Sequence, residues 1–249
     1  MSSSASLGRA VVVTTSWDDG HRLDHRLAGL LAEYQLPGTF YISPQSAEIA
    51  AGDRLSGQQL AELAGAFEIG AHTLTHPRLS MVDESTARQE IEGSRSYLED
   101  ATGSEVTSFC YPYGAYDETA VGLVRAAGFK YARTVRRFSA APGTDLFRAP
   151  TTVHAYSHRV DAVPVLRLAR LNPSAAWRLY RSWDLLAMRL FDETLRSGGV
   201  FHLWGHSWEV DSRGDWDRLR RVFAYIAGRP GVRYVVNGLI PGQVGGKHG

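Results

Sequence analysis

The chain has 249 residues, an apolar fraction of 44% and a formal net charge of +1. This length fits one large α/β barrel or two small domains, and the near-neutral charge gives no electrostatic reason to expect a nucleic-acid partner. The single cysteine, Cys110, excludes an internal disulfide and a cysteine-rich zinc cluster.

The beginning of the chain lacks the basic start and the apolar centre of a signal peptide. No stretch reaches the roughly 18 uncharged apolar residues that a transmembrane helix needs. We therefore expect a cytoplasmic protein without a transmembrane segment.

Strand-like apolar runs alternate with helix-like segments along the chain. Strands are predicted at 11–17, 39–42, 67–71, 106–110, 129–134, 146–153, 199–203 and 233–236. Helices are predicted at 22–34, 56–66, 83–98, 117–127 and near 216–227, with Ser56 and Asp83 as N-caps. Such alternation is typical of a parallel sheet covered by helices. We expect one α/β domain over 11–240, a disordered tail at 1–10 and a flexible tail at 241–249.

The segment 156–198 interrupts this alternation. It is rich in Arg, Leu and Trp, and Pro173 separates two predicted helices. One interpretation is a solvated basic face over an apolar stripe. The others are a lid, a dimer surface or a contact with an anionic membrane. We expect a helical insertion here and leave its role open among these.

Metal-binding side chains follow two of the predicted strands. Asp18 and Asp19 end the first strand, and His72 and His76 follow the third. One Asp and two His form a standard ligand set for a catalytic divalent metal with an open position for water. The other Asp is then free to act as a base. The combination predicts metal-assisted hydrolysis.

The ends of the strands support one shared site. In parallel barrels the chemistry lies at the carboxyl ends of the strands. Six candidate residues follow a predicted strand directly: Asp18, Asp19, His72, His76, Tyr113 and His206.

Spacing alone does not identify the metal ligands, because eight of the nine histidines fall in pairs four residues apart. These pairs are His21/His25, His72/His76, His154/His158 and His202/His206. The second pair follows a strand and is broken by threonines and Pro77, as a loop-borne ligand pair would be.

The other histidines are expected to play different parts. His21 could line the pocket, His202 is expected to be a core residue inside its strand, and His206 is expected to face the pocket as an acid. His25 is expected to face solvent, and the pair at 154 and 158 has no assigned role.

Taken in order, these motifs resemble those of the polysaccharide deacetylase family, carbohydrate esterase family four. Its Thr-Phe-Asp-Asp-Gly motif corresponds to the segment 15–20, Thr-Ser-Trp-Asp-Asp-Gly in this chain. Its His-Ser/Thr-x-x-His motif corresponds to 72–76. Its Arg-x-Pro-Tyr-Gly motif corresponds to 110–114, and 38–42 is typical of its second strand. The resemblance covers roughly 11–135 and, in part, 199–236, but not 136–198.

The resemblance implies a distorted (β/α)₇ barrel and a metal-dependent N-deacetylase. It implies that Asp19, His72 and His76 hold the metal, that Asp18 is the general base and that His206 protonates the leaving amine. It also implies that the motif Pro112, Tyr113 and Gly114 contacts the substrate, with the backbone N–H of Tyr113 stabilising the oxyanion.

Two departures from the family pattern stand out. Cys110 occupies the position of the arginine that usually pairs with the base, and we predict that Arg133 or Arg148 supplies this charge from another strand. An arginine at salt-bridge distance from Asp18 would satisfy that prediction. The family's Asp-x-x-Asp-Trp motif is also not found, so the residue that tunes His206 is not indicated by the sequence.

Zinc is the expected metal, and the ligand set also suits cobalt, nickel, iron or manganese. The expected substrate is a small-molecule or carrier-linked N-acetylated sugar, against which Trp208, Trp204 and Tyr113 could stack. A deformylase or a hydrolase of cyclic amides or ureides is an alternative on the same barrel. A non-catalytic site that binds glycan or metal is another, and an oligomer is possible.

Overall fold

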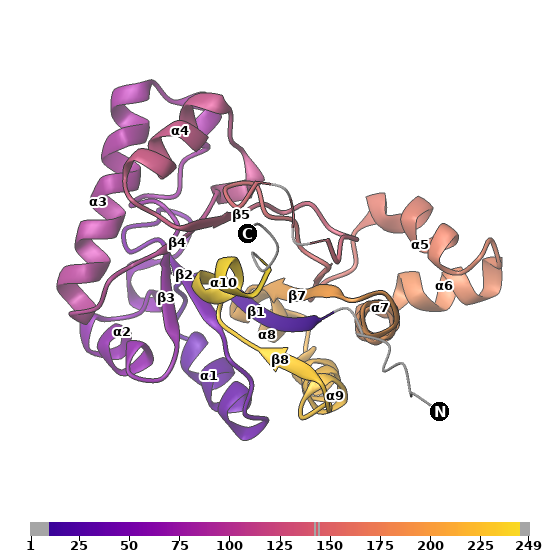
Figure 1. Ribbon diagram of the computed structural model, residues 1–249. Coiled ribbons are helices and arrows are strands. Elements are labelled where there is room, and N and C mark those ends of the chain that lie inside the picture. The colour runs from indigo at the N-terminus through magenta and orange to yellow at the C-terminus, as the bar shows by residue number, and fades with distance from the viewer. Residues whose placement is uncertain (1–9, 142, 144, 245–249) are drawn as a thin grey trace, which may run out of the picture.

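A curled parallel sheet forms the centre of the molecule (Figure 1). The computed structural model describes residues 10–141, 143 and 145–244. The strands are β1 (Val11–Asp19), β2 (Thr39–Ile42), β3 (Glu68–Ala71), β4 (Ser108–Cys110), β5 (Tyr131–Arg133), β6 (Val153–His154), β7 (Gly199–Gly205) and β8 (Val232–Tyr234). Their order is β5-β4-β3-β2-β1-β7-β6, with β8 paired to β1 and all pairs parallel. The predicted α/β fold, a distorted barrel in one domain, is confirmed.

The two ends of this sheet are joined by the segment 146–152. The N–H of Ala149 donates to the carbonyl of Ala132 in β5 at 3.0 Å, and the N–H of Thr152 donates to the carbonyl of His202 in β7 at 3.0 Å. We predicted a strand at 146–153, but regular pairing is confined to β6. Pro150 interrupts the ladder because it has no N–H to donate.

Helices surround the strands (Figure 1). They are α1 (Asp24–Glu33), α2 (Gly57–Ala64), α3 (Glu84–Thr102), α4 (Glu118–Ala126), α5 (Ala162–Leu168), α6 (Pro173–Arg181), α7 (Trp183–Ser197), α8 (Ser207–Ser212), α9 (Trp216–Ile226) and α10 (Ile240–Val244). Ser56 and Asp83 cap α2 and α3 as predicted, each accepting a backbone N–H three residues on. The short helices α8 and α10 were not predicted, because one or two turns are too short to show a periodic pattern.

The predicted tails fall mostly outside the described residues. This applies to 1–9 and 245–249. Residues 241–244, which we assigned to the flexible C-terminal tail, belong instead to α10. No helix in the described part of the chain is long and apolar enough to cross a bilayer.

The predicted insertion at 156–198 divides into two parts. Helices α5 and α6 pack on each other and project from the barrel (Figure 1). Helix α7 packs on β7 and α9, and is therefore part of the helical layer of the barrel. Pro173 is the first residue of α6, where its missing N–H has no intrahelical partner to lose.

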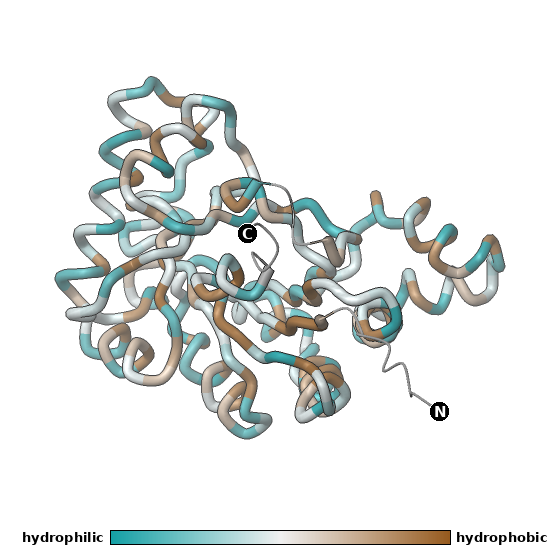
Figure 2. The backbone as a smooth tube through the Cα atoms, viewed as in Figure 1, coloured by the Kyte–Doolittle hydropathy of each residue, from teal (hydrophilic) through white to brown (hydrophobic). Residues whose placement is uncertain are grey.

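The core is built around β1, whose nine residues are all buried. Apolar residues gather at the central strands and on the inner sides of the helices (Figure 2). Helix α9 buries Leu219, Val222, Phe223 and Ile226, the i, i+3, i+4, i+7 face of an amphipathic helix. This packing holds β1 rigidly, and the strand ends in Asp18 and Asp19.

Removing one aromatic contact tests how tightly β1 is held. Phe223 packs edge-on against Trp17 of β1, with ring centroids 6.1 Å apart. We expect Phe223→Ala to lower the free energy of unfolding by about 3–5 kcal/mol in urea denaturation, because the lost ring leaves a cavity. The matched control is Leu239→Ala, at an exposed position, with an expected change within about 0.5 kcal/mol. Similar losses for both variants would contradict this packing.

Candidate metal centre and active site

The candidate residues converge because their strands are parallel and end at the same mouth of the barrel. Asp18 and Asp19 end β1, His72 directly follows β3, and His206 directly follows β7. Glu90 of α3 fixes the loop that carries His76. One oxygen of Glu90 accepts the backbone N–H groups of residues 74 and 75 at 2.8 Å each, and the other accepts the hydroxyl of residue 75.

Three of the predicted ligands lie at metal-site spacing. Oδ1 of Asp19 is 3.6 Å from Nε2 of His72 and 3.4 Å from Nε2 of His76, and the two Nε2 atoms are 3.2 Å apart. Ligands about 2.0–2.1 Å from a tetrahedral metal are separated by about 3.4 Å. Oδ1 of Asp19 is also buried without a hydrogen-bond donor. The set therefore fits one divalent cation.

The far nitrogens of both imidazoles orient the rings. Nδ1–H of His72 donates to the carbonyl of Cys110 at 2.7 Å, and Nδ1 of His76 lies 3.2 Å from Oε2 of Glu48. Burial and the neighbouring imidazole of His76 lower the pKa of His72 to about 4. His72 is therefore neutral near pH 7, and its Nε2 lone pair is free for a cation.

Two other clusters contain metal-binding residue types: Asp18 with His72 and Cys110, and His154 with His206 and Glu209. The first fits less well because burial raises the pKa of the Cys110 thiol well above its ordinary value. In the second, the Glu209 carboxylate already lies within 3.2 Å of both imidazoles. The set of Asp19, His72 and His76 is the one left with an unsatisfied ligand oxygen.

Asp18 is held by a buried arginine. The guanidinium of Arg133 donates to both carboxylate oxygens of Asp18, and both side chains are buried. Burial acts to raise the pKa of Asp18, but the charge of Arg133 outweighs it and lowers that pKa to about 2. Arg148 pairs instead with Asp145 and Glu118. Of the two arginines that we predicted, the structure brings only Arg133 to Asp18.

The position of Arg133 explains the cysteine at 110. Cys110 of β4 and Arg133 of β5 are register partners on neighbouring strands. The positive charge that the family motif would place on β4 is therefore supplied from the neighbouring strand β5, at the same level of the sheet. The ring of Trp204 lies 4.6 Å from the guanidinium carbon and covers the buried cation.

His206 is held by a residue that sequence reasoning missed. Nδ1 of His206 lies 3.2 Å from Oε2 of Glu209, and its Nε2 lies 3.9 Å from Oδ2 of Asp19. Burial lowers the pKa of His206, but the hydrogen bond to Glu209 and the charge of Asp19 raise it to about 9. The i, i+3 spacing at the start of α8 was the available signal for Glu209.

Glu209 is shared with a second imidazole. Nε2 of His154 lies 3.2 Å from the same carboxylate oxygen, and the ring of His154 stacks on Trp204 with centroids 3.8 Å apart. Nδ1 of His154 lies 2.6 Å from Nε2 of His158. The pair at 154 and 158, left unassigned from sequence, therefore supports the acid side of the site.

The remaining candidates form the rim. Trp208 donates its indole N–H to Oδ2 of Asp19 at 2.9 Å, which orients the carboxylate. The hydroxyl of Tyr113 bonds to Glu48. Pro112, Tyr113 and Gly114 form a 3₁₀ turn, and a Cβ at Gly114 would lie 2.3 Å from the side chain of Val135. Only glycine fits this turn without displacing its neighbour.

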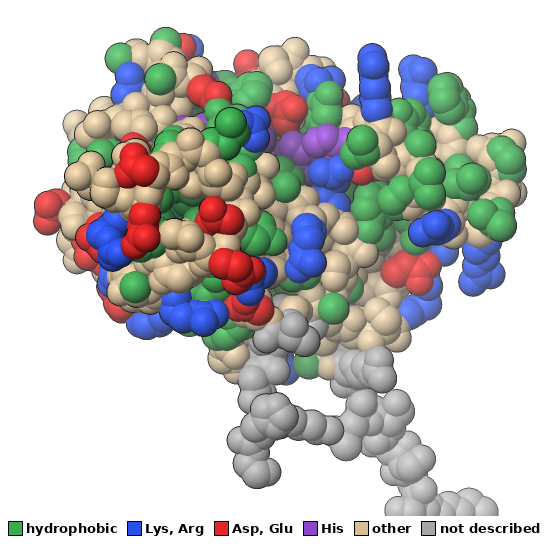
Figure 3. Space-filling view, turned by 90° about the horizontal axis from the view of Figure 1, so that it is seen from above, with side chains coloured by type: hydrophobic (Ala, Val, Ile, Leu, Met, Phe, Trp, Pro, Cys, Tyr) green, Lys and Arg blue, Asp and Glu red, His purple; other side chains and the backbone are tan. Residues whose placement is uncertain are grey.

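Two cavities meet at Asp19. The larger, of about 360 Å³, is lined by both aspartates, the ligand histidines, His206, Tyr113 and Trp208. A second, of about 280 Å³, includes His21, Asp53 and Trp208. His202 lies outside both and hydrogen-bonds Ser16 in the core, as expected. Histidine side chains are visible between the two halves of this face (Figure 3).

Comparison with known proteins finds a family match over the first half of the chain. The polysaccharide deacetylase family model matches residues 7–132. An uncharacterized protein of Streptomyces coelicolor is 31% identical over 121 residues, which are 47% of this chain and 45% of that protein. The matched region therefore spans about half the length of this relative.

Solved structures share the fold. A protein of Mycobacterium smegmatis described as a polysaccharide deacetylase has a TM-score of 0.67 at 20% identity, covering 95% of this chain and 91% of that chain. The Streptococcus pyogenes deacetylase PplD, solved with acetate, has a TM-score of 0.52 at 19% identity, covering 55% of this chain and 62% of that chain.

A swap of register partners tests the arginine. Arg133→Cys leaves Asp18 buried and uncompensated, so we expect a loss of about 3–5 kcal/mol in the free energy of unfolding. Adding Cys110→Arg restores a cation at the same level and should recover most of that loss. Arg148→Cys, whose partners are more exposed, is the control and should cost about 0–1 kcal/mol. No recovery in the double variant would count against the exchange of positions.

A pH titration tests the role of Glu209. The folded pKa of His206, about 9, lies above its ordinary value of 6.5. Its bound proton therefore stabilises the fold fully below about pH 6.5, and this contribution is lost as the pH rises through about 9. In metal-free protein, Glu209→Gln should move the pKa of His206 down toward 6.5 and flatten this loss, measured by NMR and urea denaturation. Glu193→Gln is the control, and equal titration in all three proteins would refute the role.

Proposed function

The chain belongs to the polysaccharide deacetylase family, and we propose that it is a metal-dependent hydrolase that removes an N-acetyl group from an amino sugar. The observation that supports this most is the division of labour between two adjacent carboxylates. Asp19 faces two imidazoles, whereas Asp18 is paired with Arg133 and stays outside the ligand set.

Asp19, His72 and His76 would hold the metal, and zinc is the ion that we propose. A divalent cation there supplies Lewis-acid chemistry for polarising an acyl carbonyl and activating water. Trp208 and Glu48 keep the ligands oriented through Asp19 and His76. The Trp208 hydrogen bond is of the kind that fixes ligand geometry at metal sites, and the Glu48 carboxylate lies 3.2 Å from Nδ1 of His76.

Asp18 acts as the general base in this proposal. The low pKa keeps its carboxylate ionised, and Arg133 fixes its direction. The carboxylate accepts a proton from the attacking water as the hydroxyl oxygen bonds to the acyl carbon. Tyr113 lies in the first turn of a 3₁₀ helix, where N–H groups lack intrahelical partners. Its N–H is therefore free to stabilise the oxyanion.

His206 acts as the general acid. With a pKa of about 9 it carries the required proton at neutral pH, and Glu209 holds its Nδ1–H. Nε2–H donates its proton to the amide nitrogen as the carbon–nitrogen bond breaks. The products are acetate and a free amine. A base and an acid held by separate charged partners can act in the same turnover.

A sugar fits the rim of the cavity. Tyr113 and Trp208 are among the exposed large side chains of the described residues and lie at the mouth beside the ligands. Aromatic faces at a polar mouth suit the apolar face of a sugar ring. We propose a small-molecule or carrier-linked N-acetylated sugar as the substrate and the cytoplasm as its location.

Product analysis with and without metal tests the function. Metal-loaded protein is incubated with N-acetylhexosamines, free and carrier-linked, and with formamido sugars and ureides, and the released acid is measured. We expect acetate release that stops with a chelator and returns with zinc. Asp18→Asn should lower kcat by roughly 10²–10⁴-fold at unchanged metal content. Glu193→Gln is the control and should keep wild-type kcat.

Three outcomes would contradict the proposal. Acetate release in excess chelator would remove the role of the metal. Formate or ureide hydrolysis without acetate release would indicate the alternative hydrolase. Bound zinc and bound glycan with no turnover on any amide would indicate a binding protein.

A further inference from the structure

Helices α5 and α6, with the turn that joins them and the turn before α5, form an arm over residues 159–181. The arm carries five arginines: Arg159, Arg167, Arg170, Arg178 and Arg181. Within the described residues none of the five forms an ion pair, whereas the arm's one acidic residue, Asp161, is bound to Arg137 at 2.6 Å. The arm therefore presents uncompensated positive charge.

Large apolar side chains are exposed among these arginines. Val160 is 76% exposed, Leu171 69%, Trp177 60% and Val163 58%. Val163 precedes Arg167 by four residues on α5, and Trp177 precedes Arg181 by four on α6, so each pair shares a helix face. The right-hand part of the space-filling view shows the same mixture of hydrophobic and basic side chains (Figure 3).

The tip of the arm holds one of these apolar side chains outward. Arg170 and Leu171 have φ angles of 54° and 61°, a left-handed conformation that non-glycine residues rarely adopt. The N–H of Leu171 donates to the carbonyl of Leu166 at 2.9 Å, which fixes this turn. The conformation is thus specified locally, and it leaves Leu171 in solvent.

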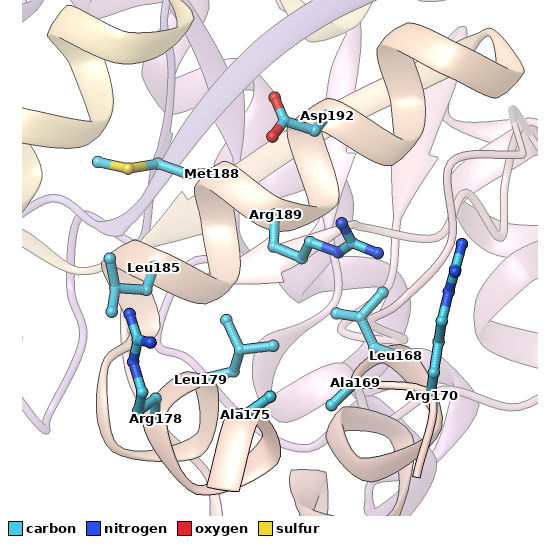
Figure 4. A pocket seen from close by; sticks show the side chains of 10 residues that line it. All are labelled: Leu168, Ala169, Arg170, Ala175, Arg178, Leu179, Leu185, Met188, Arg189 and Asp192. Carbon is cyan, nitrogen blue, oxygen red and sulfur yellow. The ribbon is translucent and has the colours of Figure 1, made fainter. Parts of the chain in front are cut away.

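A hollow of about 420 Å³ lies between the arm and α7. Leu168, Leu179 and Leu185 line it, and Arg170 and Arg178 stand at opposite sides (Figure 4). An apolar interior flanked by guanidinium groups suits a molecule with a hydrocarbon chain and an anionic head. A nucleic acid could pair its phosphates with these arginines, but it has no hydrocarbon chain to fill the apolar interior.

We propose that the arm docks onto the surface of an anionic lipid bilayer. The arginines contact lipid phosphates, and Val160, Val163, Leu171 and Trp177 enter the interface, as in other basic and apolar membrane-surface elements. Arg137 lines the catalytic cavity and pairs with Asp161 at the base of the arm. Docking would therefore bring the cavity close to the membrane, and it does not depend on which bond the site hydrolyses.

Vesicle binding tests the proposal. The full chain is sedimented with vesicles of phosphatidylcholine alone or of phosphatidylcholine mixed with phosphatidylglycerol. We expect binding only to the anionic vesicles, weakening as salt is added. Arg170→Gln, Arg178→Gln and Arg181→Gln together should weaken it on the order of 100-fold, since each basic residue near the surface contributes roughly fivefold. The charge-matched control combines Arg88→Gln, Arg196→Gln and Arg220→Gln.

The apolar contribution is measured with a second pair of variants. Leu171→Ser with Trp177→Ser should weaken binding at least about tenfold, because two side chains no longer enter the interface. Met81→Ser with Leu239→Ser removes exposed apolar side chains elsewhere and should bind as wild type does. Circular dichroism of each variant shows that the helices remain folded.

Four results would overturn the proposal. They are equal binding to both vesicle types, equal weakening by the arm and control variants, binding to duplex DNA in place of vesicles, and a dimer in solution that only the arm variants dissociate. The last two would assign the arm to a nucleic acid or to a second copy of the chain.

Discussion

The site depends on how β1 ends. Two adjacent aspartates leave a buried central strand in different directions, because Asp19 adopts a left-handed conformation with φ of 84°. Asp18 meets Arg133 inside the barrel, and Asp19 meets the two imidazoles and Trp208. Two neighbouring carboxylates that share one site repel each other, and this repulsion raises the pKa of one of them. Separate partners thus assign the two carboxylates to separate tasks.

Trp204 lies between the two halves of the site. In the first half, the base Asp18 is paired with Arg133, whose guanidinium carbon lies 4.6 Å from the Trp204 ring. In the second half, the acid His206 is paired with Glu209. His154 also contacts Glu209, and it stacks on the same indole. The groups that tune the base and the acid are thus packed around one buried aromatic side chain. Changes there should affect both halves together.

Much of the fold and the centre of the site could be predicted from the sequence. The alternation of elements indicated the parallel sheet, and the order of the motifs indicated that Asp19, His72 and His76 would converge. The cysteine at 110 indicated a displaced arginine. The structure then selected Arg133 over Arg148, which depends on strand register that single-sequence patterns do not specify.

The supporting residues could not be predicted in the same way. Glu48, His154 and Glu209 reach the site from a loop, the two-residue strand β6 and a short helix, and their contacts join segments far apart in the chain. No periodic pattern marks such residues. The boundary of the insertion was misjudged for a related reason, since α7 resembles α5 and α6 in composition and only packing on β7 assigns it to the barrel.

The central claim is that one divalent ion is shared by Asp19, His72 and His76 while Asp18 stays free. Anomalous diffraction at the zinc edge from crystals of zinc-loaded protein tests it most directly. The account predicts a peak about 2.0–2.2 Å from Oδ1 of Asp19 and from Nε2 of both histidines. A peak instead among His154, His206 and Glu209, or none at Asp19, would contradict it.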